Sequence, residues 1–110
     1  MPDFAFKTES ELQSFLLEWI NKQPGCVAWR NPSNALRKHR NKWARNGVAD
    51  IIGCWRGRFL AVEVKSPTGK IKVSPEQWAF AGDIRDSGGL AIIVASVDDF
   101  FEYLHAEKLL

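Results

Sequence analysis

Two acidic residues and a lysine stand in neighbouring apolar segments of this 110-residue chain. Asp50 lies near the start of the first segment, and twelve residues separate it from Glu63, which is followed by Val64 and Lys65. Two carboxylates held close together repel each other and favour a cation between them. Oxygen ligands with open water positions suit Mg²⁺ or Mn²⁺ better than zinc. These residue types predict metal-assisted hydrolysis of a phosphate ester, with Lys65 positioning or helping to deprotonate the attacking water.

The two segments that carry these residues have the pattern of a β-hairpin. Apolar runs at 49–55 and 58–65 are separated by Arg56 and Gly57, which predict a tight turn. Side chains alternate along a strand, so Glu63 and Lys65 share one face, and the hairpin returns the chain beside Asp50. An ion pair on a half-solvated strand would explain Glu63 and Lys65 equally well. The nearby Asp50 favours a metal site instead.

Further helices and strands can be placed around this hairpin. Thr8 with Glu11, and Ser74 with Gln77, have the spacing of capping boxes at helix starts. We expect helices from these two points, a third helix starting at Ser96 and running through Tyr103, and strands at 26–30 and 90–95. The predicted order is αβββαβα. It indicates one α/β domain over residues 1–110, with a small mixed sheet flanked by helices.

Charge is unevenly distributed along the chain. Residues 30–72 contain eleven Lys or Arg residues and two acids, Asp50 and Glu63, for a net charge of +9. The remaining residues contain four basic and eleven acidic side chains, for −7, which gives the overall charge of +2. A basic middle and an acidic remainder are expected of a protein that meets a polyanion on one face. An ordinary solvated charged surface is the alternative.

Composition and cysteine content indicate a cytoplasmic globular protein. The chain is 45% hydrophobic and 25% charged, which is typical of a folded domain. No apolar run reaches the length of a membrane span, and the first residues lack a signal-peptide pattern. Cys26 and Cys54 lie in apolar runs, so we expect buried free thiols, which suit a reducing compartment.

The spacing of the two acids and the lysine resembles the PD-(D/E)XK nuclease motif, in which Asp50 would be followed after twelve residues by Glu63-Val64-Lys65. The predicted αβββαβ order also resembles the restriction-endonuclease-like core of that superfamily. Within it, the whole chain resembles a stand-alone VRR-NUC domain. The segments that carry this resemblance are 9–13, 29–31, 47–53, 58–65, 74–77 and 88–96. The chain departs from the family pattern at Ala49, where relatives have proline, and at Ala95, where relatives often have arginine.

The resemblance implies a Mg²⁺- or Mn²⁺-dependent DNA endonuclease that is specific for branched DNA, such as a Holliday junction or a flap. It also implies a homodimer, because the small stand-alone members are similar to junction resolvases that act as dimers. We expect a bacterial or phage-infected cell as the setting, with no membrane attachment and no organic cofactor. A restriction-type duplex endonuclease and an inactive DNA-binding module of the same fold are the alternatives.

The same resemblance assigns metal binding to Asp50, Glu63 and the backbone carbonyl of Val64, and it adds a glutamate from the first helix. At about 100° per residue, Glu9 lies roughly 50° from the centre of the apolar stripe, whereas Glu11 and Glu18 lie roughly 110° to 130° away. Glu9 is therefore the candidate, although a favourable charge on the helix dipole would also explain it. The resemblance also places Gln77 near the site, in competition with its capping role.

The basic loop after the first strand and two later lysines are the candidates for DNA contact, because basic clusters bind phosphates and release counterions. Trp43 in this loop is expected either to stack on an unpaired base or to anchor the loop to the core. The predicted DNA-binding residues are Arg30, Asn31, Ser33, Arg37, Lys38, Arg40, Lys42, Trp43, Arg45, Lys70 and Lys72.

Overall fold

The computed structural model describes residues 5–32 and 43–110. Its elements are α1 (Glu9–Asn21), β1 (Cys26–Arg30), β2 (Ile51–Trp55), β3 (Arg58–Val64), α3 (Pro75–Asp86), β4 (Leu90–Val94) and α4 (Val97–Ala106). The predicted order αβββαβα is confirmed. Some boundaries differ from the prediction: β2 begins at Ile51 and not at residue 49, β3 and β4 each end one residue earlier than predicted, and α4 continues three residues past Tyr103.

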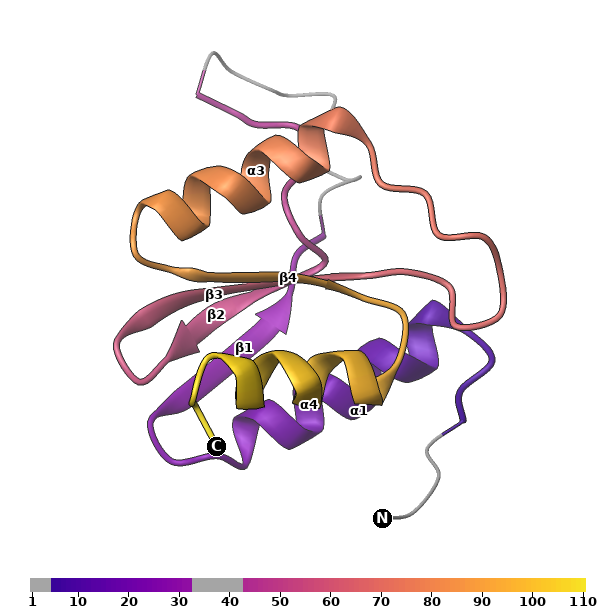
Figure 1. The fold of residues 1–110 in the computed structure, drawn as a ribbon, viewed down its shortest axis with the longest axis horizontal. Helices are drawn as coiled ribbons and strands as arrows, with labels where there is room; N and C mark the ends of the chain where they lie inside the picture. Colours follow the sequence, from indigo (N-terminus) through magenta and orange to yellow (C-terminus); the bar gives the residue numbers. More distant parts are fainter. Residues whose placement is uncertain (1–4, 33–42) are drawn as a thin grey trace.

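The four strands form one mixed sheet in the order β1-β2-β3-β4. β1, β2 and β3 pair in antiparallel fashion, whereas β3 and β4 run parallel. The predicted hairpin turn is present, and Arg56 and Gly57 both adopt positive φ angles (47° and 88°), as a type I′ turn requires. Helix α3 lies on one face of the sheet, and α1 and α4 lie on the other (Figure 1).

Alternation along β3 divides the core into two parts. Leu60, Val62 and Val64 are buried against α1 and α4 in the larger core. Ala61 faces the other way and packs with Ala91 of β4 and with α3. Small alanine side chains on this face allow α3 to approach the sheet closely. Among the described residues α3 packs against β3 and β4, which leaves the outer side of β1 and β2 open.

The helix starts are fixed by the caps that the sequence predicts. Thr8 and Glu11 form a reciprocal capping box at α1, and Ser74 and Gln77 form another at α3. Ser96 caps α4 by accepting a hydrogen bond from the Asp99 backbone N–H. These three caps fix where each helix begins relative to the sheet, and the cap at α3 is part of the candidate site.

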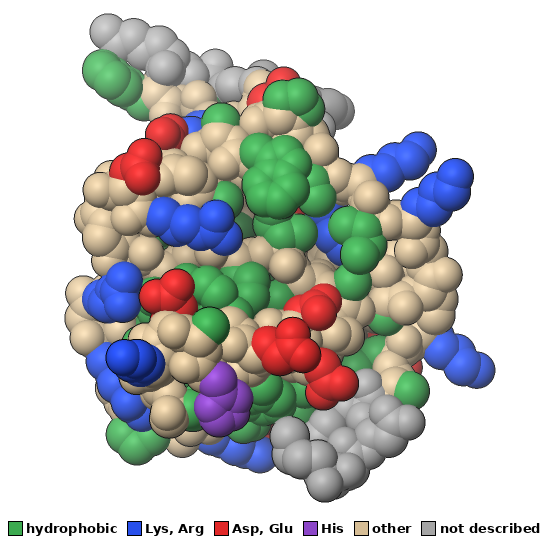
Figure 2. All heavy atoms as spheres, viewed as in Figure 1, with side chains coloured by type: hydrophobic (Ala, Val, Ile, Leu, Met, Phe, Trp, Pro, Cys, Tyr) green, Lys and Arg blue, Asp and Glu red, His purple; other side chains and the backbone are tan. Residues whose placement is uncertain are grey.

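Acidic and basic side chains occupy different parts of the fold. Apart from Asp50 and Glu63, every described acidic residue lies in a helix or directly at its end. In Figure 2 acidic side chains gather over α4, whereas Lys and Arg side chains project from the edge where the chain passes from β3 to α3. The basic middle of the sequence therefore corresponds to β1, β2, β3 and their connections.

The two cysteines are free thiols, but they are not both buried. Cys26 is partly buried, and Cys54 is exposed. The prediction of burial is wrong for Cys54 because its side chain lies on the face of β2 that α3 does not cover. No helix in the described parts of the chain has the length and apolar character needed to cross a bilayer.

Candidate active site

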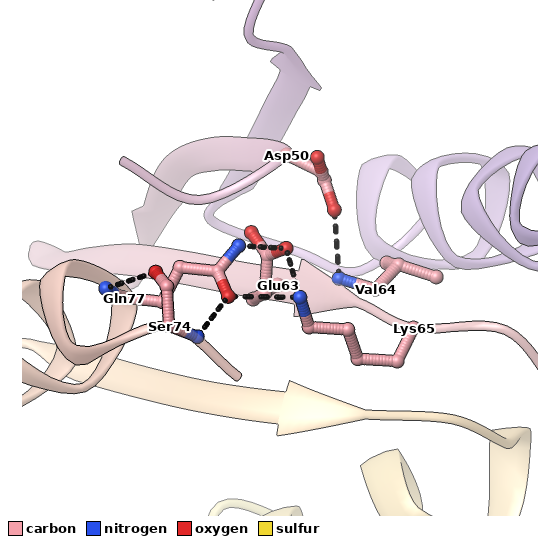
Figure 3. Close-up of polar contacts among 6 residues, drawn as sticks. All are labelled: Asp50, Glu63, Val64, Lys65, Ser74 and Gln77. Carbon is pink, nitrogen blue, oxygen red and sulfur yellow. Dashed lines mark hydrogen bonds and ion pairs between the residues drawn. The ribbon is translucent and has the colours of Figure 1, made fainter. Parts of the chain in front are cut away.

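Asp50 and Glu63 meet at the end of the β2–β3 ladder, on the face that carries α3. The register pairs Ile51 with Val62, so the next residues along, Asp50 and Glu63, come side by side. The Oδ2 atom of Asp50 accepts a hydrogen bond from the Val64 backbone N–H at 2.9 Å (Figure 3). This bond fixes the Asp50 carboxylate although Asp50 lies outside the strand.

Glu63, Lys65 and Gln77 form a closed network beside Asp50 (Figure 3). Gln77 donates from Nε2 to Glu63 Oε2 at 2.8 Å, and Lys65 Nζ donates to Gln77 Oε1 at 2.8 Å. Lys65 Nζ also lies 3.2 Å from Glu63 Oε2, and both side chains are nearly buried, with exposed fractions of 13% and 10%. The amide of Gln77 thus holds the acid and the lysine at once.

Gln77 also completes the cap of α3. Its Oε1 atom accepts from the Ser74 backbone N–H at 3.0 Å, while its own backbone N–H donates to Ser74 Oγ at 3.1 Å. The capping role and the site-proximal position were alternatives in the sequence, but the structure shows both together. The start of α3 is therefore coupled directly to Glu63 and Lys65.

The surroundings of Glu63 favour its protonated form. The pKa of Glu63 is raised from 4.5 to about 7, mainly by burial and also by the Asp50 carboxylate, while Lys65 opposes the shift. The second oxygen of Glu63, Oε1, is buried and has no hydrogen-bond partner among residues 5–32 and 43–110. A buried carboxylate oxygen without a partner is costly, so a group that neutralises this charge would stabilise the site.

These observations fit a divalent cation with oxygen ligands. Within residues 5–32 and 43–110, no three His, Cys, Asp or Glu side chains gather into one site. The described part of the chain would supply the carboxylates of Asp50 and Glu63, and water and substrate would fill the other positions. Mg²⁺ is usually bound in this way, through one or two carboxylates.

Glu9 is not brought together with the two acids. It lies in the exposed first turn of α1, and α1 packs on the face of the sheet opposite to Asp50 and Glu63. The position of Glu9 around α1 gives no information on which face of the sheet the helix covers. The backbone N–H of Val64 has a defined role in holding Asp50, whereas metal binding by its carbonyl stays a prediction.

Asn31, one of the predicted DNA-binding residues, makes hydrogen bonds within the protein. Its backbone N–H donates to the Asp50 carbonyl at 2.8 Å, and its Nδ2 atom donates to the Ala49 carbonyl at 3.2 Å. Asn31 therefore holds the segment that carries Asp50.

Gly47 supports the same segment. It has φ +80°, and a Cβ atom at this position would collide with the Glu76 carbonyl in the first turn of α3. Sequence reasoning missed both roles, which depend on contacts distant in the chain.

The predicted DNA-binding residues have mixed environments. Arg30 donates to Ser14 Oγ at 2.7 Å on α1, and Arg45 pairs with Asp83 of α3 at 2.5 Å. Trp43 is 82% exposed, so the prediction that it anchors the loop to the core is wrong. Lys70 and Lys72 are exposed between β3 and α3. Ser33, Arg37, Lys38, Arg40 and Lys42 lie outside the described residues.

Comparisons with known proteins bear on the fold. No protein-family model matches the chain, and no curated protein matches its sequence. A solved structure described as a VRR_NUC domain protein matches it with a TM-score of 0.64 and 18% sequence identity, covering 94% of this chain and 89% of that chain. The predicted resemblance is confirmed in the order and arrangement of the elements. The chain therefore has the fold of a VRR_NUC domain.

Proposed function

We propose that the chain is a divalent-metal-dependent endonuclease that hydrolyses DNA phosphodiester bonds. The observation that carries this proposal is the Glu63 carboxylate, which is buried beside Asp50. Within the described part of the chain one of its oxygens has no hydrogen-bond partner, and a lysine is held against the other. Asp50 and Glu63 would bind Mg²⁺ or Mn²⁺, together with the Val64 carbonyl. When bound, this ion would polarise a phosphate oxygen and lower the pKa of a coordinated water molecule.

The side chains around the acids have separate roles in this proposal. The Val64 N–H orients Asp50, and Gln77 orients Glu63 and Lys65. The ammonium group of Lys65 has three donors, and Glu63 and Gln77 use two of them. Among the described residues no partner takes the third donor, which would serve the attacking water or a phosphate oxygen. Lys65 would thus position the nucleophile and offset the charge that develops on the phosphate.

We further propose that the substrate is branched DNA, such as a Holliday junction or a flap, and that the chain acts as a homodimer. The resemblance to stand-alone VRR-NUC domains supports both proposals, and a two-fold dimer would match the symmetry of a junction. The basic residues of β1–β3 and their connections supply charge for a polyanion. The free thiols of Cys26 and Cys54 are compatible with the cytoplasm of a bacterial or phage-infected cell.

Cleavage assays with the Lys65→Ala variant test the proposed chemistry. We expect wild-type protein to cut branched DNA with Mg²⁺ or Mn²⁺ but not with EDTA, and we expect Lys65→Ala to lower the rate about 100-fold or more. Lys22→Ala is the matched control, because Lys22 is exposed at the end of α1 and pairs with Glu18. Cutting that persists in EDTA, or in Lys65→Ala, contradicts the proposal.

Substrate choice is tested in the same assay. Equal cutting of a junction and of its separate linear arms would indicate a duplex endonuclease. Tight DNA binding without uptake of a divalent ion, measured by calorimetry, would indicate an inactive binding module.

Two substitutions at Gln77 separate its capping role from its role beside the acids. Gln77→Glu keeps an oxygen for the Ser74 N–H but places a third carboxylate beside Glu63, so the pKa of Glu63 should rise. We expect the pH for half-maximal cleavage to move upward by about one unit, with α3 still capped. Gln77→Ala removes both roles and should cost about 1 kcal/mol of stability. Unchanged pH profiles in both variants would show that Gln77 only caps the helix.

A further inference from the structure

The face of the sheet that carries the two acids is covered by α3 over β3 and β4 but not over β1 and β2. Along β1 the side chains on this face are Val27 and Trp29, which are 50% and 51% exposed. Cys54 of β2 pairs with Val27, and Phe59 of β3 pairs in turn with Cys54; both Cys54 and Phe59 are exposed. We call the side chains of Val27, Trp29, Cys54 and Phe59 the open sheet face.

Trp29 is the member of the open sheet face that stands closest in register to the acids. It pairs with Ile52, and Asp50 lies two residues before Ile52, so Trp29 and Asp50 are diagonal neighbours across the two strands. Diagonal neighbours lie about 7–8 Å apart, within reach of an aromatic side chain. Two residues further along β1, the backbone N–H of Asn31 donates to the Asp50 carbonyl. An exposed indole therefore borders the candidate site on its uncovered side.

Approach to the site is restricted by the packing of α3. Gln77 and Phe80 of α3 stand over the β3–β4 side of Glu63, and Gly47 lies against the first turn of the same helix. Among the described residues β1 and β2 are not covered by a helix on this face, so a polymer whose phosphate reaches Asp50 and Glu63 can extend over the open sheet face. The nucleotide next to that phosphate would then meet Trp29.

Charge identifies the kind of partner that fits this face. The described acids other than Asp50 and Glu63 lie in helices or directly at their ends. The basic residues Arg45, Lys65, Lys70 and Lys72 lie before β2 or after β3, whereas Arg30 is held on α1, on the other side of the sheet from Trp29, by Ser10 and Ser14. An anionic strand is attracted to such a surface, whereas a second copy would bring two basic halves together. Aromatic side chains next to basic residues are typical of single-stranded nucleic acid binding.

We propose that Trp29 stacks on an unpaired base of the nucleotide next to the scissile phosphate, and this proposal rests on the proposed function. Bases within a duplex are already stacked on both sides and cannot offer a face to the indole. Unpaired bases at a flap, fork or junction can do so. Trp29 would thus give the protein a preference for branched over linear DNA that does not depend on base sequence.

Fluorescence anisotropy with two labelled DNAs tests this role in EDTA, where the metal-dependent reaction is blocked. One probe is a fork with an unpaired arm, and the other is a fully paired duplex of the same length. We expect Trp29→Ala to weaken binding of the fork about tenfold and binding of the duplex less than twofold. Trp29→Phe, which keeps an aromatic face, should retain most of the affinity, whereas Trp29→Leu should behave like Trp29→Ala.

Trp78→Ala is the matched control, because Trp78 is 56% exposed but is carried by α3 and not by the sheet. Equal loss of affinity for both probes, or no loss for the fork, would overturn the proposal. It would also be overturned if Trp29→Ala halved the mass in sedimentation equilibrium, since the open sheet face would then be a contact between copies.

The outcome is distinguishable from failure of the proposed function. If wild-type protein cuts no DNA with Mg²⁺ or Mn²⁺ but Trp29→Ala still loses fork binding selectively, the nuclease assignment fails and the stacking role stands. If wild-type protein cuts branched DNA and Trp29→Ala binds the fork as tightly as wild type, the stacking role alone is wrong.

Discussion

Replacement of Asp50 by asparagine is expected to lower divalent-dependent DNA cleavage about 1,000-fold or more while leaving the fold intact. The amide oxygen of asparagine can still accept the hydrogen bond from the Val64 N–H, so the segment before β2 keeps its place. The negative charge that would bind the metal is lost, and with it several kcal/mol of charge stabilisation in the transition state. Single-turnover cleavage of branched DNA with Mg²⁺ measures the effect.

The control for this variant is Asp98→Asn, which removes an exposed carboxylate from the first turn of α4. It should cleave at nearly the wild-type rate. Calorimetric titration provides a second measurement: wild-type protein should take up Mn²⁺, and Asp50→Asn should take up far less. Cleavage by Asp50→Asn within tenfold of wild type would rule out Asp50 as a metal ligand.

Replacement of Glu63 by glutamine is expected to stabilise the metal-free protein at pH 8 and to abolish cleavage. Because the pKa of Glu63 is raised from 4.5 to about 7 in the folded chain, its contribution to stability is complete below pH 4.5 and is lost as the pH rises through 7. Glutamine carries no titrating proton and mimics the neutral acid. The gain in the free energy of unfolding should approach about 3 kcal/mol at pH 8 and be small at pH 5.

Denaturant unfolding in EDTA at both pH values measures this difference. Glu76→Gln, which changes an exposed acid at the start of α3, is the control and should show little dependence on pH. Added Mg²⁺ should stabilise wild-type protein at pH 8 and leave Glu63→Gln unchanged, since a ligand stabilises only the state that binds it. An equal stability difference at pH 5 and pH 8 would show that Glu63 is not held protonated by the fold.

Local sequence patterns were sufficient for the elements and for the three central site residues. Capping boxes at Thr8 and Ser74 predicted where α1 and α3 begin, because caps act within four residues. The strict alternation of a strand predicted that Glu63 and Lys65 share a face. The short hairpin turn then determined that Asp50 returns beside Glu63.

Other site properties depended on how distant elements pack. Gln77 looked like a cap or a site residue, and only the docking of α3 on β3 showed that one amide performs both roles. Glu9 is not gathered with the acids in the described part of the chain, because the face of the sheet that α1 covers is not encoded within the helix. Cys54 was expected to be buried, but α3 does not extend over β2.

The sequence by itself determined the order of elements, the resemblance to a VRR-NUC domain and the grouping of Asp50, Glu63 and Lys65. These three features depend on residues that are close together in the chain or lie within one hairpin. Only the tertiary structure decided which helix covers each sheet face. That arrangement buries Glu63 and raises its pKa, and it exposes Trp29 at a position diagonal to Asp50. It also leaves Oε1 of Glu63 without a partner among the residues that the structure describes. Burial and exposure are properties of packing between layers, so local sequence patterns cannot fix them.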